Sequence, residues 1–113
     1  MKELIDICKT KDGLIVNCKS LEQAIDLFEV VHMLGCDKGT LRAFRIIQDM
    51  HRENTCHRIR NSSGVWLHTH ANYEWYADHD MPVYQFSEFA SMAFGCEAGS
   101  PVVADDIDIA SLF

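Results

Sequence analysis

Two histidines, His68 and His70, stand two residues apart in an alternating segment of the sequence. Residues two apart on a strand point to the same face, so their imidazoles would project together, with His57 as a candidate neighbour on a partner strand. Imidazole is a good ligand for zinc and other transition metals. Two histidines supply at most half of such a site, so the sequence leaves metal binding open and predicts no cofactor. The alternative is that both rings face solvent or pack on aromatic side chains.

Nucleophile and phosphate-loop motifs are absent from the sequence. Cys56 and His57 are adjacent, but neighbours on a strand point to opposite faces, so this pair cannot touch directly. Neither glycine-rich phosphate-loop pattern occurs. We therefore predict a protein that is not an enzyme. The five cysteines are scattered with no Cys-x-x-Cys pair, which predicts free thiols, several of them packed as small apolar side chains.

Charge is distributed unevenly along the chain. The net charge is −7, yet residues 1–60 contain all 10 lysines and arginines, and residues 61–113 contain none. This asymmetry predicts an interaction surface of one sign, although acids also serve solubility alone. The later acids are Glu74, Asp78, Asp80, Glu88, Glu97, Asp105, Asp106 and Asp108.

Basic residues gather in the middle of the chain, between residues 38 and 60. If they share one side, they could meet phosphates or an acidic protein. The net charge argues against general binding of nucleic acid, and the alternative is pairing with the acids of the second half. These residues are Lys38, Arg42, Arg45, Arg52, Arg58 and Arg60.

The clearest element is a helix over residues 20–34. Ser20 and Gln23 form the spacing of a capping box, and apolar residues recur with helical spacing up to Gly35, which is well placed to end the helix. Glu22, Asp26 and Glu29 are predicted to lie on the opposite, polar side.

Other elements follow from turn residues and alternation. We predict a second helix at 40–52, capped by Thr40, with Gln48 among its polar residues. The remaining expectations are a strand at 14–18, a hairpin of 55–60 and 65–70 around a turn at 61–64, a short helix at 71–78, a strand at 81–86 and a helix at 88–94 capped by Ser87, with residues 2–9 open between helix and strand.

This order predicts one α+β domain over residues 1–113, with 97–113 as an acidic tail. We expect two layers: a sheet of about four mostly antiparallel strands, packed by one long helix, with a ferredoxin-like βαββαβ arrangement as one allowed topology. No apolar run approaches the roughly 18 residues that cross a bilayer. The N-terminus carries acids where a signal peptide would be apolar, so we expect the protein in the cytoplasm.

A loose group of small, uncharacterised bacteriophage and prophage proteins resembles this chain over roughly residues 13–90. The likeness lies in the segments Leu14–Ala24, Asn54–Ile59, Trp75–Tyr76 and Tyr84–Phe89. Residues 36–53 depart from the group, which usually has a tryptophan-containing loop where this chain has a predicted helix. The resemblance supplies no catalytic residues. It implies a phage protein that binds a host protein in the host cytoplasm, as anti-CRISPR inhibitors of similar size and charge do.

Together these observations predict a small binding protein that inhibits a bacterial defence effector by occupying a basic surface of it. Glu74, Asp78, Asp80 and Glu88 are the expected contacts, and Trp66 is an expected interface anchor if its face of the strand is exposed. We expect no membrane and no direct nucleic-acid partner, and the sequence leaves homodimer formation open. The alternative is a domain that binds a small ligand, a nucleotide or a metal, through the basic helix or the histidine pair.

Overall fold

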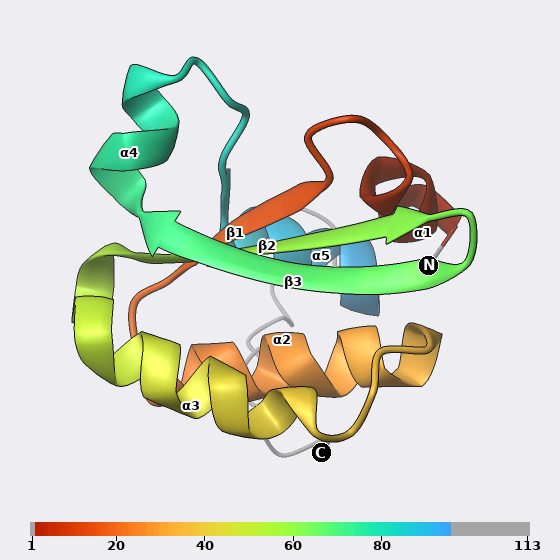
Figure 1. Ribbon diagram of the computed structural model, residues 1–113, viewed down its shortest axis with the longest axis horizontal. Helices are drawn as coiled ribbons and strands as arrows, with labels where there is room; N and C mark the ends of the chain where they lie inside the picture. The colour runs from red at the N-terminus through yellow and green to blue at the C-terminus, as the bar shows by residue number, and fades with distance from the viewer. Residues whose placement is uncertain (1, 96–113) are drawn as a thin grey trace.

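Four strands form one mixed sheet in the spatial order β3-β2-β1-β4 (Figure 1). The computed structural model describes residues 2–95. The strands are β1 (Leu14–Cys18), β2 (Thr55–Ser62), β3 (Val65–Asn72) and β4 (Tyr84–Gln85). β2 is antiparallel to both β1 and β3, whereas β4 runs parallel to β1. β3 and β4 are therefore the two edges of the sheet.

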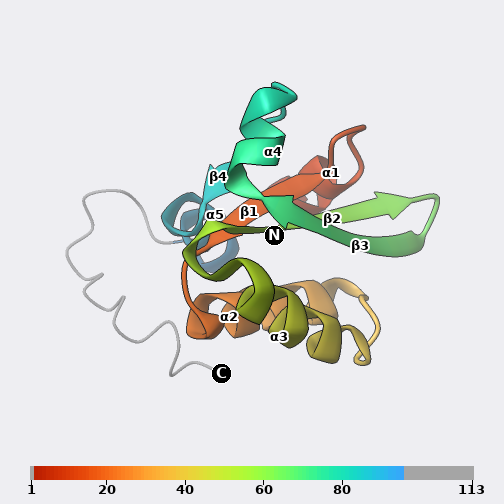
Figure 2. The same cartoon turned by 60° about the vertical axis from the view of Figure 1, so that its left-hand side comes forward.

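Helices cover the two faces of this sheet unequally. α2 (Leu21–Leu34) and α3 (Thr40–His51) lie side by side beneath one face, while α4 (Tyr73–Asp78) projects on the other side (Figures 1 and 2). α1 (Lys2–Cys8) and α5 (Phe86–Phe94) complete the domain. A 3-10 turn at Arg52–Asn54 joins α3 to β2.

The main core lies between the sheet and the helix pair. Strand residues such as Val16 and Ile59 pack there with Leu27, Val31 and Phe44, all of them buried. On the opposite face, a second and smaller cluster forms around Ile15, Cys56 and Tyr76. The two-layer α+β class is confirmed. The long helix does not pack the sheet alone, because α3 lies beside it.

Local signals placed the strongest elements correctly. The predicted helix at 20–34 is α2, in which the Ser20 hydroxyl accepts from the Gln23 N–H at 3.2 Å and Gly35 forms the C-cap. Gly35 approaches Trp66 so closely that a Cβ there would lie 2.7 Å from the indole Nε1. Residues 2–9, left open by the sequence, form α1, and the strand at 14–18 is β1.

Several element boundaries and helix faces differ from the prediction. Thr40 is the first residue of α3 and does not cap it, since the N-cap is Gly39. Gln85, with Glu88, caps α5 instead of Ser87, so the last strand shrinks to two residues. Asp26 and Gln48 are buried although both were predicted on polar helix sides.

Two aspects of the predicted topology are wrong. A ferredoxin-like fold is built from βαβ crossovers between parallel strands, whereas β1 and β2 are antiparallel neighbours. The hairpin turn is also tighter than predicted, because Ser63 and Gly64 alone connect the paired strands, both with positive φ. The predicted tail at 97–113 lies outside the described residues. No helix within residues 2–95 is long and apolar enough to cross a membrane.

Gly13 occupies a position that a side chain would disturb. Its φ is +74°, and an added Cβ would lie 2.6 Å from the Ile59 carbonyl oxygen and 2.4 Å from Cγ of Arg60. Gly64 has a similar φ of +86° but open space around it. The two glycines therefore separate backbone strain from steric overlap.

We predict that Gly13→Ala lowers the free energy of unfolding by roughly 2–4 kcal/mol, because backbone strain and overlap both act there. Gly64→Ala should cost only about 1 kcal/mol, the strain alone. Urea unfolding of the two variants and the wild type measures the difference. Equal losses would show that the close approach of Gly13 to β2 contributes nothing.

Candidate functional site

Four histidines gather where α3 meets the β2–β3 hairpin. Nδ1 of His57 lies 3.0 Å from Nε2 of His68, and Nε2 of His51 lies 3.3 Å from Nδ1 of His70. The Phe44 ring stacks on His57 and His68, with ring centroids 4.4 and 4.1 Å away. The predicted meeting of the strand histidines is therefore confirmed, and the rings pack on an aromatic side chain. His51 was not expected in this group.

Gln48 fixes the arrangement of the buried part of the network. Its amide nitrogen donates to the backbone oxygens of Cys18 and Arg52, both at 2.8 Å. Its Oε1 lies 3.1 Å from Nε2 of His57 and can only accept, so that imidazole nitrogen carries the hydrogen. Nδ1 of His57 is then the acceptor for the N–H at Nε2 of His68.

Desolvation keeps His57 and His68 neutral. Desolvation, followed by the neighbouring imidazoles, lowers the pKa of His57 to about 3. Desolvation and His70 lower the pKa of His68 to about 4. A proton added at Nδ1 of His57 would also place two N–H groups against each other and break the hydrogen bond to His68. The network thus holds α3 on the sheet only in its uncharged form.

Metal binding finds no support among the described residues. Within residues 2–95, no three or more His, Cys, Asp or Glu side chains are arranged to hold a metal ion. Both ring nitrogens of His57 and Nε2 of His68 are already engaged in hydrogen bonds with Gln48 or with each other. The arrangement therefore supports packing between α3 and the sheet.

The described cysteines are buried free thiols, as predicted. Burial raises the pKa of Cys8 and Cys56 to about 12 and that of Cys36 to about 11, and it raises the pKa of Cys18 as well. Protonated thiols are poor nucleophiles and poor metal ligands. These residues pack as small apolar side chains, and Cys96 lies outside the described residues.

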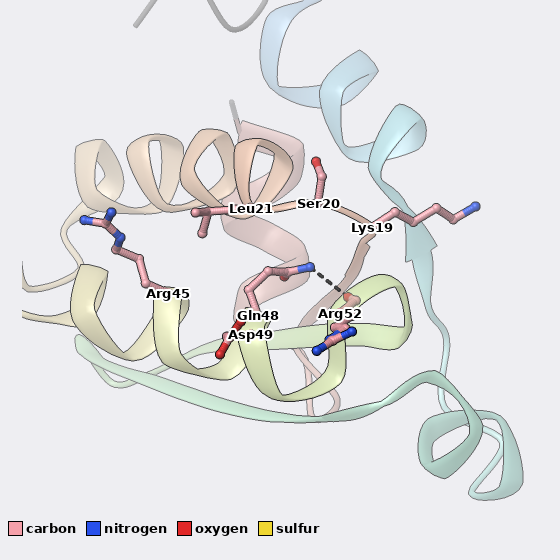
Figure 3. Close-up of a pocket in the computed structure, with 7 residues that line it drawn as sticks. All are labelled: Lys19, Ser20, Leu21, Arg45, Gln48, Asp49 and Arg52. Atoms are coloured by element: carbon pink, nitrogen blue, oxygen red, sulfur yellow. Dashed lines mark hydrogen bonds between the residues drawn. The ribbon is translucent and has the colours of Figure 1, made fainter.

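A cavity of about 270 Å³ opens between the start of α2 and the end of α3 (Figure 3). Figure 3 shows that its basic side chains diverge, with Lys19 pointing away from α3. Both amide hydrogens of Gln48 are engaged, and Ser20 caps α2. Gln48 and Ser20, two of the polar residues in its lining, therefore serve the fold. The lining residues are Lys19, Ser20, Leu21, Arg45, Gln48, Asp49 and Arg52.

The structure brings together three of the four predicted acidic contacts. Glu74 and Asp78 lie one turn apart on α4, and Asp80 follows in the turn that ends the helix, all exposed. Glu88 lies apart, on α5, where its carboxylate accepts from the Gln85 N–H at 2.8 Å. Figure 2 shows α4 and α5 as separate elements with β4 between them.

Two aromatic side chains that the prediction did not include accompany the α4 acids. Tyr73 is 40% exposed and Trp75 is 45% exposed, whereas Tyr76 points into the smaller core cluster. Trp75 stacks on His79 with ring centroids 3.9 Å apart, which holds the indole in place. Only the helical register, in which Tyr76 alone is buried, could have revealed this display.

Trp66, the predicted anchor, lies on the helix-facing side of β3. It is half-buried and packs against the main core, close to Gly35.

Arg58, a neighbour of Tyr76, donates to the backbone oxygens of Asp12 and Lys11 at 2.8 and 3.3 Å. We define the α4 surface as Tyr73, Glu74, Trp75, Asp78 and Asp80.

Comparison with protein-family models, with curated proteins and with solved structures finds no match to this chain.

We predict that acid weakens the fold through the histidine network. His57 and His68 have folded-state pKa values below the unfolded value of 6.5, so the unfolded chain binds more protons as pH falls below 6.5. Their contribution is fully present above about pH 6.5 and declines down to about pH 4 for His68 and about pH 3 for His57. At about pH 5 each histidine should have lost roughly 2 kcal/mol of stabilisation, by the conversion of about 1.4 kcal/mol per pKa unit.

Urea unfolding between about pH 7.5 and pH 5 measures this loss. His68→Gln keeps an N–H donor for His57 but removes one titrating ring, so its loss over the same range should be about half that of the wild type. Equal acid sensitivity in the variant and the wild type would contradict the assignment.

Proposed function

We propose that this protein is a non-catalytic binding protein that docks its α4 surface on a basic surface of a partner protein. The observation that carries the proposal is the display of Tyr73 and Trp75 beside Glu74 and Asp78 on one projecting helix, with the exposed Asp80 in the turn that follows. Tryptophan and tyrosine are the side chains most enriched at the energetic centres of interfaces. Carboxylates around them steer association with a positive surface.

Helix α4 suits this role because its own packing needs are small. Tyr76 alone is buried and joins the helix to Ile15 and Cys56 on the sheet. Asn72 caps the helix, accepting from the Trp75 N–H at 2.9 Å, so the short helix is held at its start as well. The remaining side chains of α4 are exposed and can form contacts outside the chain.

The partner class rests on the resemblance to small phage proteins. We propose a bacterial defence effector, such as a nuclease whose nucleic-acid channel is basic. A carboxylate-rich helix can occupy such a channel because it presents the charge that the channel attracts. Glu74, Asp78 and Asp80 are the proposed charged contacts. Glu88 and Trp66 belong to the α5 cap and the core.

We predict that the protein captures a partner from bacterial lysate at low salt and that capture weakens at high salt. Glu74→Gln with Asp78→Asn should weaken affinity about tenfold at low salt, because two exposed charges near a positive surface are removed. Trp75→Ala should weaken it about thirtyfold or more, as expected for loss of an aromatic anchor.

Matched controls separate these effects from net charge and exposed area. Glu3→Gln with Asp6→Asn removes the same charge from exposed positions on α1, and Met33→Ala truncates a side chain that is 67% exposed on α2. Both control variants should bind the captured partner with the same affinity as the wild type. The proposal fails if no partner is recovered from lysate at low salt, or if the control substitutions weaken binding as much as the α4 substitutions do. Circular dichroism verifies that each variant is folded.

A further inference from the structure

A second cavity, of about 630 Å³, lies between the loop after α1 and the turn of the β2–β3 hairpin. Figures 1 and 2 show this loop and the hairpin tip at the same end of the sheet. Its volume lies within the range of small-molecule sites. The lining residues are Lys9, Thr10, Lys11, Arg60, Asn61, Ser62, Ser63 and Gly64.

The lining of this cavity has one sign of charge. Lys9, Lys11 and Arg60 supply three cations, and no carboxylate is among the lining residues. The cavity at α3 differs, because Asp49 lies there with the basic residues. Serine, threonine and asparagine side chains complete the second lining, and no aromatic ring is present. Such a site favours an anion that accepts several hydrogen bonds.

Arg60 has an unused donor. Its Nε is buried, and no acceptor among residues 2–95 forms a hydrogen bond with it. A buried guanidinium N–H without a partner costs free energy. Because Nε is covered by protein atoms, an anion in the cavity would be bound by the terminal nitrogens of this guanidinium. The adjacent Arg58 shows the alternative, since its Nε donates to the Asp12 oxygen at 2.8 Å.

Both walls of the cavity are held in place by local bonds. The Thr10 hydroxyl donates to the Ile7 oxygen at 2.6 Å and accepts from the Gly13 N–H at 3.2 Å. On the hairpin, the Gly64 N–H donates to Oδ1 of Asn61 at 3.0 Å. The stem of Arg60 passes next to Gly13, where a Cβ would collide with it. The cations are therefore presented by ordered backbone.

We propose that this cavity binds the polyphosphate moiety of a small molecule, such as pyrophosphate or a nucleoside triphosphate. Three cations match the charge of linked phosphates, and phosphate oxygens are suitable acceptors for a guanidinium N–H. The absence of aromatic lining means that recognition rests on the phosphates and not on a base. The site shares no residue with the α4 surface, so the result of its test does not depend on the proposed function.

Titration of the ¹⁵N-labelled protein with pyrophosphate at low salt, followed by NMR, tests the site. Amides of residues 9–11 and 61–64 should shift with saturation at millimolar concentrations. ATP should shift the same amides, whereas adenosine should not. Absence of saturable shifts, shifts centred elsewhere, or binding of adenosine alone would overturn the proposal.

Charge variants complete the test. Lys9→Gln with Lys11→Gln changes two exposed residues and should weaken pyrophosphate binding about tenfold or more, since two phosphate-facing charges are lost. Lys38→Gln with Arg42→Gln removes equal charge from exposed positions outside the lining and should leave affinity unchanged within about twofold. Arg60→Gln should abolish binding. Equal losses in the two double variants would show general electrostatics and overturn the site.

Discussion

The fold depends on one buried carboxamide, that of Gln48. It joins three parts of the chain, because it donates to the oxygens of Cys18 and Arg52 and accepts from His57. A buried amide that lost these partners would leave several polar groups unpaired, at about 1–3 kcal/mol each. α3 therefore docks on the sheet in one register. Phe44 then stacks on His57, which is held in its neutral form.

The face of the sheet that α2 and α3 cover holds the main core, and this affects the face on which α4 lies. The helix pair satisfies one side of the sheet, so the opposite side needs only the small cluster of Ile15, Cys56 and Tyr76. One residue of α4 is enough to hold that helix, and its remaining aromatic and acidic side chains face outward. The acidic residues in the described part of the second half of the sequence therefore lie in two separate places. The α4 part forms a surface, while Glu88 is used to cap α5.

How much the sequence predicts depends on the range of the interactions. Ser20 and Gln23 could be recognised because a helix cap is made within a few residues. The burial of Gln48 could not, since its hydrogen-bond partners lie up to 30 residues away in the sequence. The cavity that joins Lys9 to Arg60 was equally hidden, because hairpin and loop meet only in the folded sheet. The histidine pair was predictable from alternation, but its packing role required Phe44 from a different element.

Site-specific photocrosslinking tests the central claim, that partner proteins dock on the α4 surface. A benzophenone amino acid placed at Tyr73 would report contacts of α4, and the same group at Met33 would report contacts of an exposed position on α2. Irradiation in bacterial lysate at low salt should give a discrete crosslinked partner from position 73 and none from position 33. A partner crosslinked equally from both positions, or only from position 33, would contradict the account.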